Sequence, residues 1–410
     1  MTEFFEVQPP DQARQRWFSQ ITHQVEVEYI PTHETLGRVT ADVIHSAEAL
    51  PAFQRSMVDG YAVQANSTYG ASDSLPTYLR VVGEILMGKE AEITVQKGEA
   101  ALIHTGGMIP RGADAVVMVE HTQPIDEREI EVLKAAAPGE NVLQIGEDVT
   151  PNSPILPARH RIKAQDIGAM LAVGWNEHVP VVKRPRVCIF STGDELVHPL
   201  AEKLKLGQIR DINSSTIQAL CAGAEAEIMG IVPDDAMELF KALEKALPTA
   251  DMLVVTAGSS VSARDMTAQV INQLGKPGVV VHGVAARPGK PTILAVVDGK
   301  PVIGLPGNPV SAFVMFRLFG VPALAHLMGT PMAIQTKVAA RVTVNVPSAA
   351  GREDYVPVRL IERNGDGEQW AEPIFGKSNL IFTLVGADGL LKIPLNVTGL
   401  REGVWGEVIL

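Results

Sequence analysis

The sequence predicts a multidomain protein of the α/β plus β class, in which an α/β domain with a parallel sheet lies between β-rich domains. A chain of 410 residues is too long for one hydrophobic core, so several domains of about 100–150 residues each are expected. Short apolar runs alternate with helical patterns after Arg186, whereas β-rich runs separated by Gly and Pro occupy the regions on either side. These changes of pattern mark domain boundaries.

The N-terminal part of the chain predicts one packing helix and a β-dominated region. Ala13, Trp17 and Ile21 recur at helical spacing and predict an amphipathic helix. From Val25 to Gly146 the chain carries the β-rich runs VEVEYI, YLRVVGEIL, EITV, ADAVVMVE and IEVL. A proline-rich segment at 151–158, followed by a helical pattern over 164–173 that stops at glycine, indicates a domain junction.

The α/β domain is predicted from strands that alternate with helices. A helix over Ala236–Leu247 would have Asp234 or Asp235 as its N-cap, and a second helix opens at Asn308-Pro309, where proline suits the first helical position. Such alternation predicts a parallel sheet with helices on both faces. The predicted strands are Val187–Phe190, Met252–Thr256, Thr292–Val297 and Val302–Leu305.

The final part of the chain returns to short strands. From about Ile334 to Leu410 the runs VAARVTVNV, DYVPVRLI, GLLKIP and GEVIL are separated by Gly and Pro turns. This pattern predicts a small C-terminal β-barrel or sandwich.

Composition excludes several classes of function. No apolar run reaches the roughly 18–20 residues that a bilayer crossing needs, and the acidic N-terminal stretch does not resemble a secretory signal. We therefore expect a cytoplasmic protein without membrane contacts. The net charge of -12 argues against nucleic-acid binding, which requires Lys and Arg to neutralise phosphates. Cys188 and Cys221 show neither a disulfide nor a metal-ligand pattern, and we interpret both as core residues.

Three predicted strand ends carry the candidate chemistry. STGDEL follows the first strand, AGSSVS with Arg264 and Asp265 follows the second, and LPGNPVS follows the last. Their small residues would let backbone N–H groups approach an anion at a helix N-terminus. Each turn alone is more often a plain connection, and a single Arg287 or Lys290 is more often solvated surface. Three such turns at successive strand ends favour a phosphate-binding crevice.

The carboxylates in these turns indicate a cation. Asp194, Glu195 and Asp265 would repel a phosphate unless a divalent ion lay between them. Oxygen ligands without histidine or cysteine favour magnesium over zinc. The sequence therefore predicts Mg²⁺, with Asp194, Glu195 and Asp265 as its ligands.

The N-terminal half contains two further candidate motifs. A polar cluster with an Asp-Gly turn lies around Asp59, and His104-Thr105-Gly106-Gly107 offers a hydroxyl beside a flexible backbone. The alternative interpretation of the first motif is a surface turn before a strand, and that of the second motif is an ordinary glycine-bearing loop. The two interpretations of the second motif stay open on the residues alone.

Taken together, these motifs resemble those of the molybdopterin molybdenumtransferase family, called MoeA in bacteria and related to the C-terminal domain of gephyrin. The resemblance runs over nearly the whole chain and rests on RSMVDGYAV, HTGGMIPRGADAVVMVE, GED at 146–148, STGDEL, GQIRDINS, GLPGNPVSA and PGKP.

The resemblance implies an architecture and a reaction. The four implied parts are an extended segmented domain (1–46 and 147–182), a β-rich second domain (47–146), a molybdopterin-binding three-layer α/β domain (183–331) and a C-terminal β-barrel (332–410). It implies a homodimer whose active site lies between the α/β domain of one subunit and the second domain of the other. In the implied reaction, adenylylated molybdopterin and molybdate react with a divalent cation, molybdenum joins the dithiolene sulfurs, and AMP is released. Molybdopterin adenylyltransferase and acceptor molybdoenzymes are the further implied partners.

The resemblance also assigns residues to roles. The catalytic set is Asp59, Thr105, Asp194, Glu195, Asp234 and Asp265. The substrate-binding set is Ser56, Gly193, Gly258, Ser259, Ser260, Arg287, Lys290, Pro306, Gly307, Asn308, Pro309, Arg352 and Ser378.

Three departures from the family pattern leave alternatives open. The loop TAGSSVSARD lacks a second glycine, Gly283 stands where some members have lysine, and NVLQI lacks arginines found in some relatives. A paralogue that handles tungstate, or a noncatalytic molybdopterin-binding scaffold, is therefore an alternative. A molybdopterin adenylyltransferase uses a similar α/β domain alone, so the large flanking regions argue against it.

Overall fold

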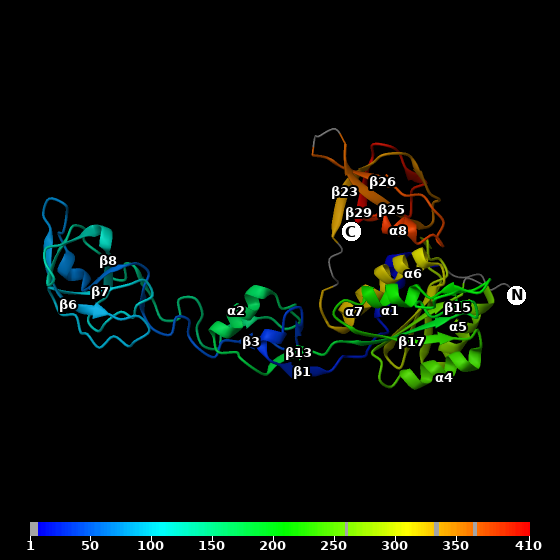
Figure 1. Ribbon diagram of the computed structural model, residues 1–410, viewed down its shortest axis with the longest axis horizontal. Coiled ribbons are helices and arrows are strands. Elements are labelled where there is room, and N and C mark those ends of the chain that lie inside the picture. The colour runs from blue at the N-terminus through cyan, green and yellow to red at the C-terminus, as the bar shows by residue number, and fades with distance from the viewer. Residues whose placement is uncertain (1–6, 259–260, 332–335, 364–366) are drawn as a thin grey trace. The chain divides into compact units, whose positions relative to one another are not determined.

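The computed structural model describes residues 7–258, 261–331, 336–363 and 367–410, and it divides into two compact units. Unit 1 comprises Met1–Glu28, Gly37–Val39 and Val181–Leu410, and unit 2 comprises Tyr29–Leu36 and Thr40–Pro180. The chain passes between the units near the short strands β1 (Val27–Ile30), β2 (Val39–Thr40) and β13 (Val179–Val182). Figure 1 shows both units, with the chain coloured from blue at the N-terminus to red at the C-terminus.

A six-stranded sheet in the order β17-β14-β18-β22-β21-β19 forms the centre of the α/β domain in unit 1. The first four strands of that order run parallel, which confirms the predicted α/β architecture. Strand β17 was not among the predicted runs, because its sequence EAEIMGIV alternates and its side chains are half-exposed. The strands are β14 (Arg186–Thr192), β17 (Glu225–Val232), β18 (Met252–Ala257), β19 (Pro277–His282), β21 (Ile293–Val297) and β22 (Lys300–Pro306).

The predicted parallel arrangement is wrong for β21 and β22, which pair antiparallel. Only Asp298 and Gly299 connect them, with φ angles of 51° and 84°. Two consecutive positive φ angles are the mark of a tight two-residue hairpin, whereas a parallel crossover needs a dozen or more residues.

Helices cover both faces of this sheet, as Figure 1 shows. On one face, α4 and α5 contact each other and bury Leu239, Leu243 and Ile271 against the sheet. Asp235, not Asp234, caps α4, because its carboxylate accepts bonds from the backbone N–H groups of Met237 and Glu238. On the other face, α3 and α6 contact β14 and β22. The helices are α3 (Asn213–Leu220), α4 (Ala236–Ala246), α5 (Val261–Leu274), α6 (Pro309–Met315), the π turn η4 (Phe316–Gly320) and α7 (Val321–Leu327).

The continuous segment Pro309–Leu327 begins at the predicted Asn308-Pro309 signal. Within the described residues it is the one helix long and apolar enough to cross a membrane, yet 78% of its apolar window is buried inside the fold. This burial is that of a core helix.

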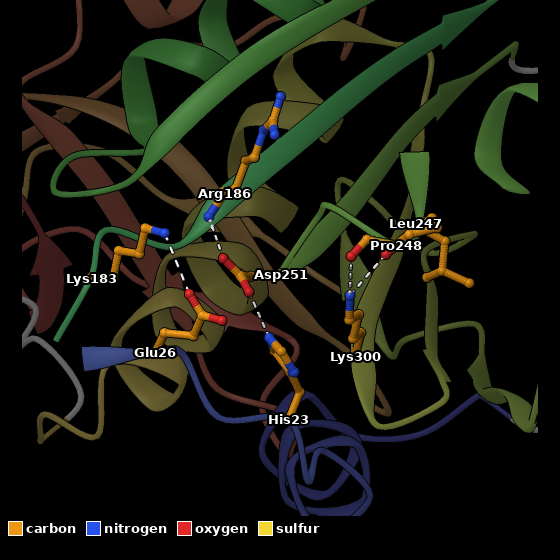
Figure 2. Close-up of polar contacts among 8 residues, drawn as sticks. All are labelled: His23, Glu26, Lys183, Arg186, Leu247, Pro248, Asp251 and Lys300. Atoms are coloured by element: carbon orange, nitrogen blue, oxygen red, sulfur yellow. Dashed lines mark hydrogen bonds and ion pairs between the residues drawn. The ribbon is translucent and has the colours of Figure 1, made fainter. Parts of the chain in front are cut away.

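Polar contacts fasten the N-terminal segment to the amino ends of the parallel strands (Figure 2). The carboxylate of Asp251 contacts His23 Nε2 at 2.6 Å and accepts a bond from the backbone N–H of Arg186 at 2.7 Å. In the same domain, Lys300 Nζ donates to the carbonyl oxygen of Leu247 at 2.8 Å. Leu247 follows the last residue of α4, and a positive charge stabilises the C-terminal end of a helix. Helix α1 (Pro10–Phe18) lies just before His23 in the chain.

The C-terminal part of unit 1 is a closed barrel, as predicted. Strands β25, β26, β23, β29 and β27 pair in that order, and β27 returns to β25. Strand β20, which precedes β21 in the chain, joins the same sheet beside β25. The elements are β20 (Ala286–Arg287), β23 (Lys337–Val342), β24 (Val346–Pro347), β25 (Glu353–Glu362), β26 (Gln369–Pro373), α8 (Phe382–Val385), β27 (Gly389–Ile393), β28 (Gly399–Leu400) and β29 (Trp405–Ile409).

Unit 2 contains a six-stranded sheet of its own, in the order β8-β5-β7-β6-β10-β9. The predicted run EITV forms only a single bridge, Thr94 to Arg111, although Val95 is buried. The predicted helix over 164–173 is present as α2 (Ala164–Ala172). The other elements are β3 (Ile44–His45), β4 (Arg55–Ser56), β5 (Gly60–Val63), β6 (Thr77–Ile85), β7 (Glu99–Ile103), β8 (Ala115–Met118), β9 (Thr122–Pro124), β10 (Glu129–Val132), β11 (Val142–Leu143) and β12 (Pro154–Leu156).

Replacement of Trp17 by alanine is expected to lower the free energy of unfolding by about 3–5 kcal/mol, the usual cost of truncating a buried aromatic side chain. Trp17 is fully buried, and its Nε1–H donates to the carbonyl oxygen of Ala295 in β21 at 2.6 Å. Denaturant unfolding measures the effect. The control Trp17→Phe keeps most of the packing and should cost less, whereas an unchanged Trp17→Ala variant would show that α1 does not stabilise the sheet.

Candidate functional site

Three adjacent parallel strands of unit 1 end at the same level. Ser191 of β14 lies opposite Thr256 of β18, and Thr256 lies opposite Leu305 of β22. The Thr256 hydroxyl donates to Ser191 Oγ at 3.0 Å, so the two strand ends are also joined by side chains. The turns that begin at Gly193, Gly258 and Gly307 therefore leave one edge of the sheet, as the sequence predicted.

The turn after β22 lies tightly against the end of β18. A Cβ atom at Gly307 would lie 2.8 Å from the carbonyl oxygen of Ala257, closer than side chains tolerate. From the other side, Asn213 Nδ2 donates to the carbonyl oxygen of Gly307 at 2.8 Å. Glycine is required here by close approach of two backbones. The result is a fixed turn that leads through Asn308 into α6.

Carboxylates gather at the β14 end of this edge. Asp194 Oδ1 accepts a bond from the backbone N–H of Asp234 at 3.3 Å, and both acids are exposed, as is Glu195. Partial desolvation and the charges of Glu195 and Asp194 raise the pKa of Asp234 above its usual value, although its side chain is exposed. A cation at this place would relieve that repulsion. Asp265 is exposed on α5, which follows β18.

The donor chemistry at this edge suits magnesium. Within residues 7–258, 261–331, 336–363 and 367–410, no three His, Cys, Asp or Glu side chains form a ready-made metal cage. Magnesium commonly uses one or two carboxylates together with substrate phosphates and waters, so a cage is not required. Asp194 and Glu195 offer oxygen donors at the end of β14, whereas Asp265 lies on α5 and forms no three-acid group with them among the described residues. The predicted phosphate-binding residues Ser259 and Ser260 lie outside the described residues.

A cavity of about 900 Å³ lies between the α/β domain and the barrel, both within unit 1. The end of β22 and the turn that follows it form part of the cavity wall, because Pro306 and Asn308 line the cavity. Asn308 Nδ2 donates to Ser378 Oγ at 3.1 Å, which joins the two domains across the wall. Six of the predicted substrate-binding residues line this cavity: Arg287, Lys290, Pro306, Asn308, Arg352 and Ser378.

The charged lining of the cavity is mostly cationic. Arg287, Lys290, Arg352 and Lys377 contribute positive charges, whereas Asp354 contributes the negative one among the described lining residues. Such a lining suits an oxyanion. Sequence reasoning missed Lys377 and Asp354. The signal for Asp354 was a carboxylate within the apolar strand EDYVPVRLIE, two residues after Arg352.

In unit 2, the two predicted catalytic residues Asp59 and Thr105 are in contact. Asp59 Oδ1 accepts bonds from the backbone N–H of Thr105 at 2.7 Å and from its hydroxyl at 3.0 Å. His104 Nδ1 lies 3.9 Å from the same oxygen, and its Nε2 lies 3.0 Å from Glu84 Oε1. The Thr105 backbone bond, its hydroxyl bond and the nearby His104 lower the pKa of Asp59, which is exposed. Asp59 is therefore an anion held at a fixed orientation.

Ser56, predicted to bind substrate, is buried beneath this loop. Its hydroxyl donates to the carbonyl oxygen of Val58 at 2.6 Å, and its backbone N–H donates to the carbonyl oxygen of Gly107 at 2.9 Å. Its carbonyl oxygen accepts from the backbone N–H of Gly106 at 2.8 Å. In this arrangement Ser56 joins the loop before Asp59 to the loop that carries Thr105.

Replacement of Thr105 by valine is expected to raise the pKa of Asp59 toward its ordinary value, because one of the two bonds that favour the anion is lost and the backbone bond remains. The wild-type carboxylate should stay ionised to lower pH than the carboxylate in the variant. A carboxyl NMR titration of Asp59 measures the shift. Thr105→Ser keeps the hydroxyl and should titrate like the wild type, and equal midpoints for valine and threonine would contradict the assignment.

Family models match three successive regions of the chain. The MoeA N-terminal region (domain I and II) matches residues 8–174, and the MoeA C-terminal region (domain IV) matches residues 339–410. Between them, the model described as "Probable molybdopterin binding domain" matches residues 188–326. These regions contain all the turns described above and, apart from Val7, the residues that line the cavity.

Individual relatives agree over nearly the full length. The chain is 32% identical to the molybdopterin molybdenumtransferase of Bacillus subtilis, over 98% of this chain and 94% of that protein. It is 33% identical to the molybdopterin molybdenumtransferase of a Nostoc species, over 93% and 88% of the two chains. A crystal structure of the MoeA molybdopterin biosynthesis protein from Pyrococcus horikoshii has a TM-score of 0.85 and 37% identity, covering 99% of both chains. The chain belongs to the MoeA family.

Proposed function

We propose that this protein is a molybdopterin molybdenumtransferase that acts in molybdenum cofactor biosynthesis. The substrates would be adenylylated molybdopterin and molybdate, and the products would be molybdenum-loaded molybdopterin and AMP. The observation that carries the proposal is the cationic cavity of about 900 Å³, whose Pro306–Asn308 wall continues into the carboxylate-bearing strand edge. A site for an oxyanion and a site for a cation would then be carried by turns that leave the same edge of the sheet.

The side chains divide into three tasks. Arg287, Lys290 and Arg352 would attract the molybdate oxygens, because guanidinium and ammonium groups stabilise oxyanions. The turn at Gly307 and Asn308, which leads into α6, would bind the pterin phosphate. Asp194, Glu195 and Asp265 would hold magnesium. When bound, that ion would neutralise phosphate charge and polarise the phosphoryl oxygen.

Asp59 and Thr105 require a further proposal about assembly. We propose a homodimer in which these residues of one subunit complete the active site of its partner, as the family resemblance implies. The ionised, oriented carboxylate of Asp59 supports a role as a water-positioning group. A cytoplasmic location, and hand-over to acceptor molybdoenzymes, belong to the same proposal.

A noncatalytic molybdopterin-binding protein is the second candidate. It is favoured by the loop TAGSSVSARD, which lacks a family glycine. The two candidates differ in product formation. Incubation with adenylylated molybdopterin, magnesium and molybdate should release AMP only if the protein is the enzyme, and competition with tungstate in the same assay would establish the preferred oxyanion.

Glu195→Gln and Asp59→Asn are each expected to abolish AMP release with little change in stability, because both side chains are exposed. Chromatographic detection of AMP measures activity, and thermal unfolding measures stability. The matched control is Glu244→Gln, an exposed glutamate on α4, which should retain full activity. A large fall in melting temperature for both site variants would assign them structural roles.

Removal of magnesium with EDTA is expected to stop AMP release, and excess magnesium should restore it, because oxygen donors hold this hard cation reversibly. Release of AMP at an undiminished rate in EDTA would refute the cation role of Asp194, Glu195 and Asp265. The Asp194→Asn variant should need a higher magnesium concentration for half-maximal activity. The Glu244→Gln control should need the wild-type concentration.

A further inference from the structure

A buried carboxylate lies between two arginines of the cavity wall. Asp354 in β25 has a side chain that is 2% exposed. Its Oδ1 accepts a bond from Arg352 Nε at 2.9 Å, and its Oδ2 lies 3.5 Å from Arg352 Nη2 and 3.6 Å from Arg287 Nη1. Arg352 precedes β25 in the barrel, whereas Arg287 belongs to β20, where it pairs opposite Asp354. One carboxylate thus contacts cations from two segments far apart in the sequence.

We propose that Asp354 is a positioning residue that orients the guanidinium groups of Arg287 and Arg352 for binding of a tetrahedral oxyanion in the cavity. The inference rests on the proposed function, since it assigns a role within the oxyanion site. Asp354 itself would not contact the oxyanion, because like charges repel. It would act through the two arginines.

The charges favour this role. Two guanidinium groups that line one cavity repel each other, and a carboxylate between them lowers that cost. Each guanidinium has five N–H donors in a rigid fork, and Asp354 faces only Nε and Nη2 of Arg352 and Nη1 of Arg287. Among the described residues no hydrogen bond is recorded for the remaining donors of these two arginines, so they can face a ligand. Arg287 and Arg352 are 63% and 37% exposed, so without a fixed partner their long side chains would sample many orientations.

A merely structural role for this carboxylate is less well supported. Strand β20 is already joined to β25 by backbone pairing, and the backbone N–H of Glu353 donates to the carbonyl oxygen of Ala285 at 2.8 Å. The neighbouring acid Glu353 has its own partners, since it contacts Lys392 Nζ at 2.9 Å and the Tyr355 hydroxyl at 2.5 Å. Glu353 is not among the residues that line the cavity. Loss of Asp354 should therefore disturb the arginines more than the strands.

The test compares Asp354→Asn with Glu353→Gln, two charge-removing changes at adjacent buried acids. Calorimetric titration of the full-length protein with molybdate measures the dissociation constant without turnover. We expect Asp354→Asn to weaken molybdate binding at least ten-fold, and Glu353→Gln to leave it within about two-fold. In the AMP-release assay, Asp354→Asn should raise the KM for molybdate more than it lowers kcat, and Asp354→Glu should recover part of the affinity.

Several results would overturn the inference. These are unchanged molybdate binding in Asp354→Asn, equal losses in both variants, or no binding of molybdate by the wild type. If Asp354→Asn does not fold, Arg352→Lys replaces it, because lysine keeps the charge but lacks the fork that Asp354 orients. Wild-type affinity in Arg352→Lys would show that orientation is unimportant, whereas a ten-fold loss would support the inference.

The same measurements separate this inference from the proposed function. Asp354-dependent molybdate binding without AMP release would leave the inference standing and remove the proposed enzyme activity. AMP release with an unchanged molybdate KM in Asp354→Asn would do the reverse.

Discussion

The functional region of this protein depends on one constraint, which is that three neighbouring parallel strands end in register. Because β14, β18 and β22 are neighbours in one sheet and end in register, their turns must leave the same edge. The backbone contact at Gly307 then fixes how closely two of those turns approach. The carboxylates of one turn and the cavity wall of another lie at the same edge of the sheet for this reason, with β18 between their two strands, although more than a hundred residues separate them in the chain.

Electrostatics divides this region into two parts of opposite character. The β14 end gathers acids whose mutual repulsion is visible in the raised pKa of Asp234. The cavity wall gathers cations around the buried carboxylate of Asp354. An adenylylated, phosphate-bearing dithiolene would present anionic groups to the cavity and would need a cation at the acidic end. This division agrees with the proposed two-substrate reaction better than with passive binding of one ligand.

Short sequence patterns predicted those elements of the fold that depend on neighbouring residues alone. The Asn308-Pro309 helix start, the face of α4 that buries Leu239 and Leu243, and the strands of the barrel all follow from short patterns. The direction of β21 could not be predicted, because an apolar run such as Thr292–Val297 has the same pattern in either direction. The Asp298-Gly299 turn carried the missing information. The sequence indicated Arg352 only through family resemblance, and Asp354 went unnoticed because its partner Arg287 is distant in the chain.

The membership of β20 in the barrel sheet has a consequence for how such proteins diversify. Its residues Ala286–Arg287 belong by sequence to the α/β domain and by hydrogen bonding to the barrel. A barrel transplanted from one relative to another at the linker after α7 would pair its Glu353 and Asp354 with the β20 of the recipient, so that Arg287 and Asp354 would come from different parents. Recombination between relatives should therefore preserve residues 286–287 and the barrel as one inherited unit.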